Sequence, residues 1–87
     1  MIKKIVKLSS ASCSPCKQYE PIFNSFKSEL ESLGWAIEIL DVTEDRGGAY
    51  AQKYGVRGVP ATLIIEEGKD PIVKMGVVNS VSDLLDS

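Results

Sequence analysis

The chain has 87 residues, of which 44% are hydrophobic and 25% are charged, and its formal net charge is −2. These values indicate one small globular domain over residues 1–87, and they exclude a disordered chain, a collagen and a coiled coil. The acidic balance provides no basic surface for nucleic acid, and no apolar run is long enough to cross a membrane.

The first third of the chain predicts a strand followed by a long helix. Residues 2–8 are rich in β-branched and aliphatic side chains and predict a strand, and the serine-rich segment 9–15 predicts a loop. Pro15 suits the first turn of a helix, and Gly34 suits its end. Between them an apolar stripe with helical spacing is formed by Tyr19, Ile22, Phe23, Phe26, Leu30 and Leu33.

The remaining elements are shorter. They are predicted as a strand at 36–42, a flexible segment at 46–48 leading into a helix at 49–54, a hairpin of strands at 62–66 and 72–75, and a last helix after the capping pattern at 80–83. The order β-α-β-α-β-β-α predicts an α/β fold with a four-stranded mixed sheet. Its first βαβ unit should be parallel and right-handed, and helices should cover both faces of the sheet.

The chain has two cysteines, Cys13 and Cys16, and no histidine. Two thiols cannot supply the four ligands of a structural zinc, so no metal is expected within one chain, although a zinc shared between two chains or a pair of structural thiols stays open. A C-x-x-C pair between a strand and a helix is typical of redox sites. The helix N-terminus and the cation of Lys17 favour a thiolate at Cys13, and Pro15 restricts the loop. Cys16, one turn inside the helix, is expected to be the more buried, resolving thiol.

Further motifs accompany this pair. The segment Ser12-Cys-Ser-Pro-Cys-Lys17 is followed by Pro21, by Tyr54-Gly-Val-Arg-Gly-Val-Pro60, by Gly68 and by Lys74-Met-Gly76. Together they resemble the thioredoxin family from Ile5 to the C-terminus. The resemblance implies a minimal thioredoxin fold of glutaredoxin size, because the chain starts at what would be the central strand of that family.

The resemblance also implies roles for individual residues. Cys13 would be the nucleophile and Cys16 the resolving thiol, with Ser14, Pro15 and Lys17 forming the active-site loop and the start of the helix. Other residues would bind the substrate: Pro60 as the family's cis proline, Val59 through its backbone, and Gly76 by leaving room for the partner.

Lys7 stands where the family has a buried aspartate behind the resolving cysteine, and Ile39 stands near the family's partner lysine. Two orientations of Lys7 are open. The favoured interpretation is that Lys7 extends to solvent beside Lys3. The alternative is that it points inward and modulates the pKa of the Cys16 thiol.

The predicted function is thiol–disulfide oxidoreduction that reduces protein disulfides by a Cys-Ser-Pro-Cys dithiol cycle. One alternative is a glutaredoxin-like, glutathione-dependent reductase, and another is a non-catalytic binding module with this fold. No bound cofactor is expected, and electrons would come from an NADPH-dependent thioredoxin reductase or from glutathione. The expected partners are that reductase and disulfide-containing proteins. Lys7 interrupts the first apolar stretch, so no signal peptide is predicted, and a cytoplasmic monomer is expected.

Overall fold

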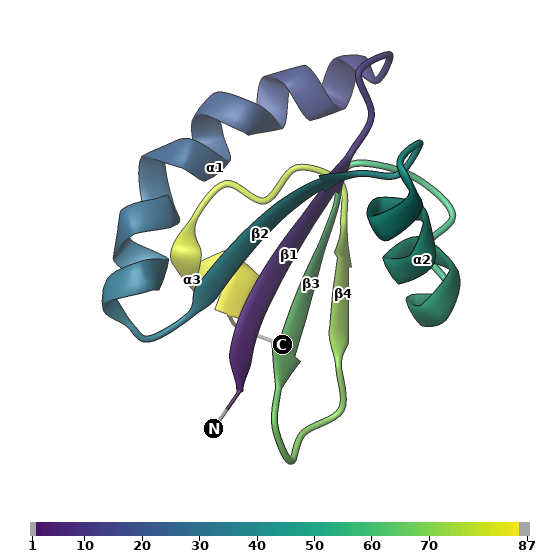
Figure 1. The fold of residues 1–87 in the computed structure, drawn as a ribbon. Helices are drawn as coiled ribbons and strands as arrows, with labels where there is room; N and C mark the ends of the chain where they lie inside the picture. Colours follow the sequence, from purple (N-terminus) through teal and green to yellow (C-terminus); the bar gives the residue numbers. More distant parts are fainter. Residues whose placement is uncertain (1, 86–87) are drawn as a thin grey trace.

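A computed structural model describes residues 2–85 and places seven elements in the predicted order. They are β1 (Lys3–Ser9), α1 (Ser14–Ser32), β2 (Ala36–Asp41), α2 (Asp45–Tyr54), β3 (Ala61–Glu66), β4 (Ile72–Met75) and α3 (Val81–Leu85). The strands lie in the order β2-β1-β3-β4, with β1 parallel to β2 and the other two pairings antiparallel (Figure 1). The predicted α/β fold with a four-stranded mixed sheet is confirmed.

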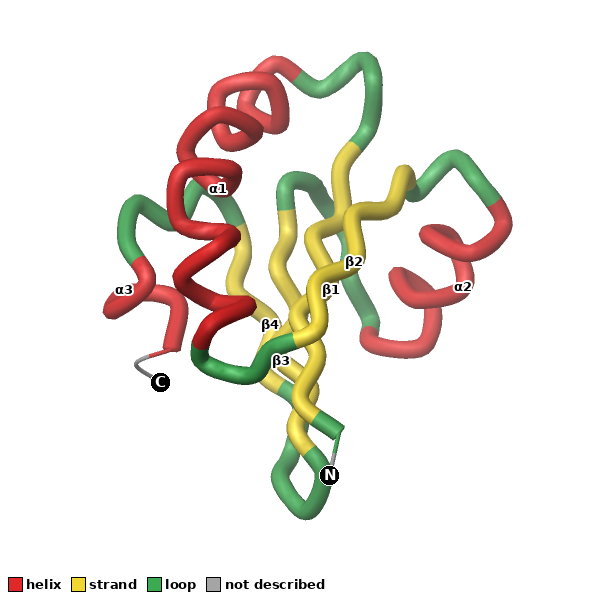
Figure 2. Tube along the Cα trace, turned by 60° about the vertical axis from the view of Figure 1, so that its left-hand side comes forward, coloured by secondary structure: helices red, strands yellow, loops and turns green. Residues whose placement is uncertain are grey.

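The sheet separates two layers of helices. Helices α1 and α3 cover one face and α2 covers the other, as both views show (Figures 1 and 2). Because side chains alternate along a strand, β1 sends Ile5 toward α1 and sends Val6 and Leu8 toward α2. The larger core lies on the α1 side, where helix α1 contributes the buried side chains Tyr19, Phe23, Phe26 and Leu30.

Helix α1 begins and ends at residues that cap it. Cys13 is the N-cap, and its Sγ accepts a hydrogen bond from the backbone N–H of Cys16. The chain leaves the helix through Gly34, whose φ of +95° favours glycine. The prediction that Leu33 belongs to the buried stripe is wrong. It is the C-cap and is 49% exposed, because the helical repeat that buries the stripe has already ended there.

Helix α2 is longer than the sequence indicated. It begins at Asp45, so the segment 46–48, predicted to be flexible, is helical. Gly47 and Gly48 each weaken a helix by their backbone freedom, which is why the sequence pattern suggested a loop. Gly47, however, is buried against the backbone of Asp41, and a Cβ there would overlap the Asp41 carbonyl group. Close packing of α2 on the end of β2 therefore outweighs the local preference.

Candidate active site

The two cysteines form a disulfide in the loop between β1 and α1. Their Cα atoms are 5.2 Å apart, which is usual for a disulfide. Cys13 is half-buried, whereas Cys16 is 4% exposed, as expected for the inner member of the pair. A turn holds the loop, since the Cys13 N–H donates to the Ser10 carbonyl at 3.1 Å. Cys13 is thus the more exposed of the two cysteines.

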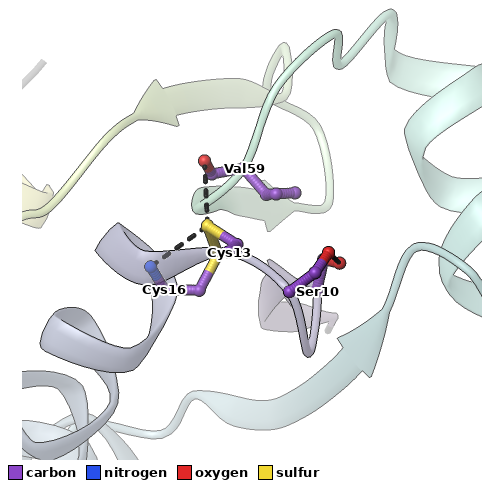
Figure 3. Close-up of a disulfide and its surroundings, with 5 residues drawn as sticks. Ser10, Cys13, Cys16 and Val59 are labelled. Carbon is purple, nitrogen blue, oxygen red and sulfur yellow. Dashed lines mark hydrogen bonds between the residues drawn. A yellow bond between two sulfur atoms is a disulfide. The ribbon is translucent and has the colours of Figure 1, made fainter.

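The segment before β3 lies against this disulfide. The Val59 carbonyl oxygen is 3.4 Å from Cys13 Sγ, although 46 residues separate them in sequence (Figure 3). The Val59–Pro60 peptide bond is cis. The Gly76 N–H donates to the Pro60 carbonyl at 2.9 Å, and the space that a Cβ of Gly76 would occupy is open. The fold therefore brings Cys13, Cys16, Val59, Pro60 and Gly76 to one place.

The three other residues assigned to the site lie at the start of α1. Ser14, Pro15 and Lys17 are all exposed in its first turn. Pro15 occupies a position where a helix needs no backbone donor. The Lys17 N–H donates to the Cys13 carbonyl at 3.3 Å, and its side chain borders the cavity behind the disulfide.

The favoured prediction for Lys7, a side chain extending to solvent, is wrong. Lys7 is 2% exposed, and its Nζ lies 5.2 Å from the centroid of the Phe23 ring and 5.7 Å from that of the Tyr19 ring. Its neighbours across the sheet are Ile39 on β2 and Thr62 on β3. The physical reason is the strand register: Lys7 alternates with Val6 and points toward α1, where the two rings enclose its side chain.

Lys7 and Cys16 share a cavity of about 290 Å³, which is large enough for several water molecules. The cavity reaches the surface, because exposed residues also form its wall. The complete lining is Lys7, Ser9, Ser10, Ala11, Cys16, Lys17, Glu20 and Asp41. Cys16 is therefore almost fully buried and borders this partly open cavity.

The ionisable groups in and near this cavity differ in their burial and in their hydrogen-bond partners. Burial lowers the pKa of Lys7, and the nearby carboxylate of Glu20 opposes that shift. Burial also raises the pKa of Tyr19, whose hydroxyl shares a 2.8 Å hydrogen bond with Thr62 Oγ1. Asp41 is already engaged, because its carboxylate accepts two hydrogen bonds from Thr43. Within residues 2–85, no carboxylate is hydrogen-bonded to Lys7 Nζ.

Sequence reasoning missed three members of this arrangement. Thr62 and Asp41 are brought beside the site by the pairing of β3 and β2 with β1, which the sequence does not specify residue by residue. Glu20 offered a usable signal, since it follows Cys16 by one helical turn and so lies on the same side of α1.

The structure also bears on metal binding and on membrane crossing. Within residues 2–85, no group of three or more histidine, cysteine, aspartate or glutamate side chains could hold a metal ion. None of the helices in this range combines the length and apolar composition that a membrane crossing requires.

Comparison with known proteins gives a consistent result. Residues 2–86 match the family model described as "Thioredoxin". The chain is 29% identical over 65 residues to a thioredoxin of Rickettsia bellii, covering 75% of this chain and 59% of that protein. It is 30% identical over 74 residues to a thioredoxin of Rickettsia typhi, covering 85% of this chain and 67% of that one. The chain thus spans about three fifths to two thirds of the length of these relatives.

The fold is also similar to solved structures. One is the germline-specific thioredoxin Deadhead of Drosophila melanogaster, with a TM-score of 0.73 and 19% identity. The superposition covers 86% of this chain and 69% of that one, and at this identity it shows a shared fold.

Proposed function

Because the chain belongs to the thioredoxin family, we propose that it reduces disulfides in proteins through the Cys13–Cys16 pair. The observation that carries this proposal is the placement of the pair. Cys13 is accessible at a helix N-terminus, Cys16 is buried behind it, and the Val59 carbonyl faces the Cys13 sulfur. A binding module without redox chemistry would not need two thiols so placed.

The reaction starts from the reduced pair. The Cys13 thiolate attacks one sulfur of the substrate disulfide, forming a mixed disulfide and releasing the other substrate sulfur as a thiolate, which takes a proton from water. Cys16, as thiolate, then attacks Cys13 Sγ. The Cys13–Cys16 bond forms, the bond to the substrate breaks, and the second substrate thiol leaves. Two electrons pass from the cysteine pair to the substrate.

The start of α1 supports the first step. The Cys13 sulfur accepts the Cys16 N–H at 3.1 Å, so a thiolate there would receive a hydrogen bond from the free end of the helix. The helix dipole favours the same charge. Lys17 adds a nearby cation on an exposed side chain. Cys13 is therefore the better first nucleophile of the two thiols.

The segment before β3 supports substrate docking. Within the described residues, nothing accepts a hydrogen bond from the Val59 N–H, and the carbonyl of the same residue faces the Cys13 sulfur. An extended substrate segment could pair with it as an added strand. Because Gly76 has no side chain and nothing lies within 4 Å of its Cβ position, the surface there is open to a partner. Val59, Pro60 and Gly76 would thus contact the partner's backbone.

The electron donor follows from the family. A disulfide so formed needs no bound cofactor, and it must be reduced again by a thioredoxin reductase or by glutathione. The proline of the Cys-Ser-Pro-Cys loop favours a reducing pair. We therefore expect a reduction potential nearer to ~−270 mV, the value of thioredoxin, than to ~−120 mV, the value of an oxidase of this fold.

The deciding experiment is insulin reduction by the purified protein, with each reductant in turn. Cys13→Ser should abolish activity, because no other first nucleophile is present, and serine can still cap the helix. Cys16→Ser should accumulate a mixed disulfide that mass spectrometry detects. Circular dichroism controls for folding of both variants. Appreciable activity in Cys13→Ser would overturn the assignment, and recycling by glutathione alone would favour the glutaredoxin-like alternative.

A further inference from the structure

Lys7 is the one charged side chain that is buried among residues 2–85. Thr62, the other buried polar residue, is hydrogen-bonded to Tyr19, whereas the Lys7 ammonium contacts ring faces and borders the shared cavity, which the carboxylate of Glu20 also lines. The first cysteine has a helix N-terminus to stabilise its thiolate. Cys16 lies inside the helix and lacks that support, and the cavity that it borders is also lined by this cation.

We propose that the Lys7 ammonium promotes ionisation of Cys16 and so speeds the resolution of the mixed disulfide. The inference rests on the proposed function and identifies a residue that regulates its second step. Lys7 acts through Cys16 and does not itself react. Its side chain reaches the cavity from β1 while Cys16 reaches it from α1, so the fold holds the two facing groups in place.

The sign of this effect depends on every charge that faces the cavity. Lys7 and Lys17 favour a thiolate at Cys16, and Glu20 and Asp41 oppose it. Asp41 is hydrogen-bonded to Thr43, and Glu20 and Lys17 are exposed, so solvent screens these two. Lys7 is enclosed by aromatic rings and is screened least. Tyr19 is hydrogen-bonded and keeps its proton. The cation therefore outweighs the carboxylates at Cys16.

In the resolution step, the proton of Cys16 goes to water and the electron pair of its thiolate forms the new disulfide bond. The Cys16 thiol loses its proton to water in the cavity, and Lys7 remains an ammonium throughout. The thiolate attacks Cys13 Sγ, and the departing substrate thiolate takes a proton from solvent. The exposed residues that border the cavity leave a route for that water. Lys7 thus favours ionisation of the Cys16 thiol through the attraction between its ammonium and the thiolate, and it does not have to accept the proton.

The direct test measures the pKa of Cys16 in Cys13→Ser, where Cys16 is the one remaining thiol. The rate of alkylation against pH gives this value without any turnover, so it does not depend on the proposed function. Lys7→Met should raise the pKa of Cys16 by about one unit, because the buried opposite charge that lines the same cavity is lost and the aliphatic volume is kept. Coincident titration curves would overturn the proposal.

Lys3→Met is the matched control. Lys3 and Lys7 lie on the same face of β1, but they are about 13 Å apart along the strand. Lys3 contacts the Leu33 carbonyl and the Trp35 ring, at the other end of α1. This substitution removes the same charge and should leave the pKa of Cys16 unchanged. An equal shift in both variants would mean that general charge, not Lys7, sets the pKa.

The kinetic test follows one turnover with an aromatic disulfide that releases one coloured thiol in each step. In Lys7→Met the second phase should slow about threefold at neutral pH. A tenfold smaller thiolate fraction is partly offset by the greater nucleophilicity of a more basic thiolate. The first phase, attack by Cys13, should be unchanged. An unchanged second phase would overturn the proposal, whereas loss of both phases in the wild type would reject the proposed function.

A measurement without a substitution at Lys7 covers the case in which Lys7→Met does not fold. Coupling between two charges is mutual. The pKa of Lys7, followed by nuclear magnetic resonance of its Cε, should therefore be higher in Cys13→Ser than in Cys13→Ser with Cys16→Ser. Equal values in these two proteins would contradict the inference.

Discussion

Lys4 and Lys7 lie three residues apart on β1 and point to opposite faces of the sheet. Lys4 Nζ lies 2.7 Å from Glu38 Oε1 and donates to the Tyr50 hydroxyl at 3.1 Å, and Arg46 Nη2 lies 2.6 Å from Glu38 Oε2. The hydrogen bond to Glu38, followed by that to Tyr50, raises the pKa of Lys4. Lys7 is more buried, has no carboxylate at bonding distance, and has its pKa lowered by burial.

The difference separates a charge that supports the fold from one that the fold tolerates. A partly exposed lysine with a hydrogen-bonded carboxylate adds modestly to stability. A buried ammonium with ring faces as its main contacts loses hydration that those contacts replace only in part. Local rules are most often broken at functional sites. Of the two lysines, it is the unpaired one that shares a cavity with a redox-active sulfur.

The largest effect on stability is expected from removing the carboxylate that pairs with Lys4. Glu38→Gln should lower the free energy of unfolding by about 1–2 kcal/mol at neutral pH, since it removes charged hydrogen bonds to Lys4 and Arg46. Urea denaturation of the oxidised protein measures this difference. Glu66→Gln is the control, because its 3.5 Å ion pair with Lys69 involves an exposed lysine and should change stability little.

The pH dependence gives this prediction a sign. The hydrogen bond from Lys4 lowers the pKa of Glu38 below its ordinary 4.5 in the folded protein. The ionised carboxylate therefore stabilises the fold above the unfolded pKa, and this contribution is lost as the pH falls through the folded pKa. Wild type and Glu38→Gln should converge in acid. A constant difference down to the lowest measurable pH would contradict the assignment.

A smaller effect on stability is expected from removing the charge of Lys7. Lys7→Met should leave the free energy of unfolding of the oxidised protein unchanged or raise it by up to about 1 kcal/mol, because a poorly compensated buried charge is removed. Lys4→Met is the matched control, since it removes a paired lysine from the same strand and should destabilise. A clear loss of stability in Lys7→Met would show that the ring contacts more than offset the lost hydration.

The difference in stability between the wild type and Lys7→Met should change at alkaline pH. Burial lowers the pKa of Lys7 from its ordinary 10.5, so between the folded and unfolded values the unfolded chain binds more protons. Wild-type stability should therefore rise relative to Lys7→Met as the pH passes through the folded pKa toward 10.5. Thermal unfolding at several alkaline pH values checks this. A difference that does not vary with pH would contradict the direction of the shift.

Much of the fold follows from local patterns in the sequence. The stripe along α1, the alternation in the strands and Gly34 at the helix end predicted all seven elements in order, since each depends on residues close in sequence. One error arose where distant packing decides, and the other where the apolar stripe was extended to the end of the helix. Gly47 is helical because α2 packs on the Asp41 backbone, and Leu33 is exposed because the helix ends just before it.

In the site, too, the local features could be predicted from the sequence and the features set by distant packing could not. The Cys13–Cys16 pair is local and could be recognised directly, and its proximity to Val59 and Pro60 was implied by family resemblance. The orientation of Lys7 could not be derived, because the long side chain of a lysine on a strand usually reaches solvent, and the sequence does not show that a cavity encloses it. The rings of α1 and the register with β3 decide it, and both are properties of the assembled fold.

The smallest effect concerns Trp35, which sharpens the contrast along the α1 face of β1. Trp35 packs under Lys3, whose Nζ is 4.7 Å from its ring, about 28 Å along α1 from the cysteines. Quenching by a disulfide requires near contact, so reduction should leave the emission of this single tryptophan almost unchanged, whereas Lys3→Met should alter it by removing the cation. Fluorescence of the oxidised and reduced proteins checks both. A several-fold change on reduction would mean that the redox state of the cysteines reaches the far end of this face, and the Lys3 end could then no longer serve as the unaffected control for Lys7.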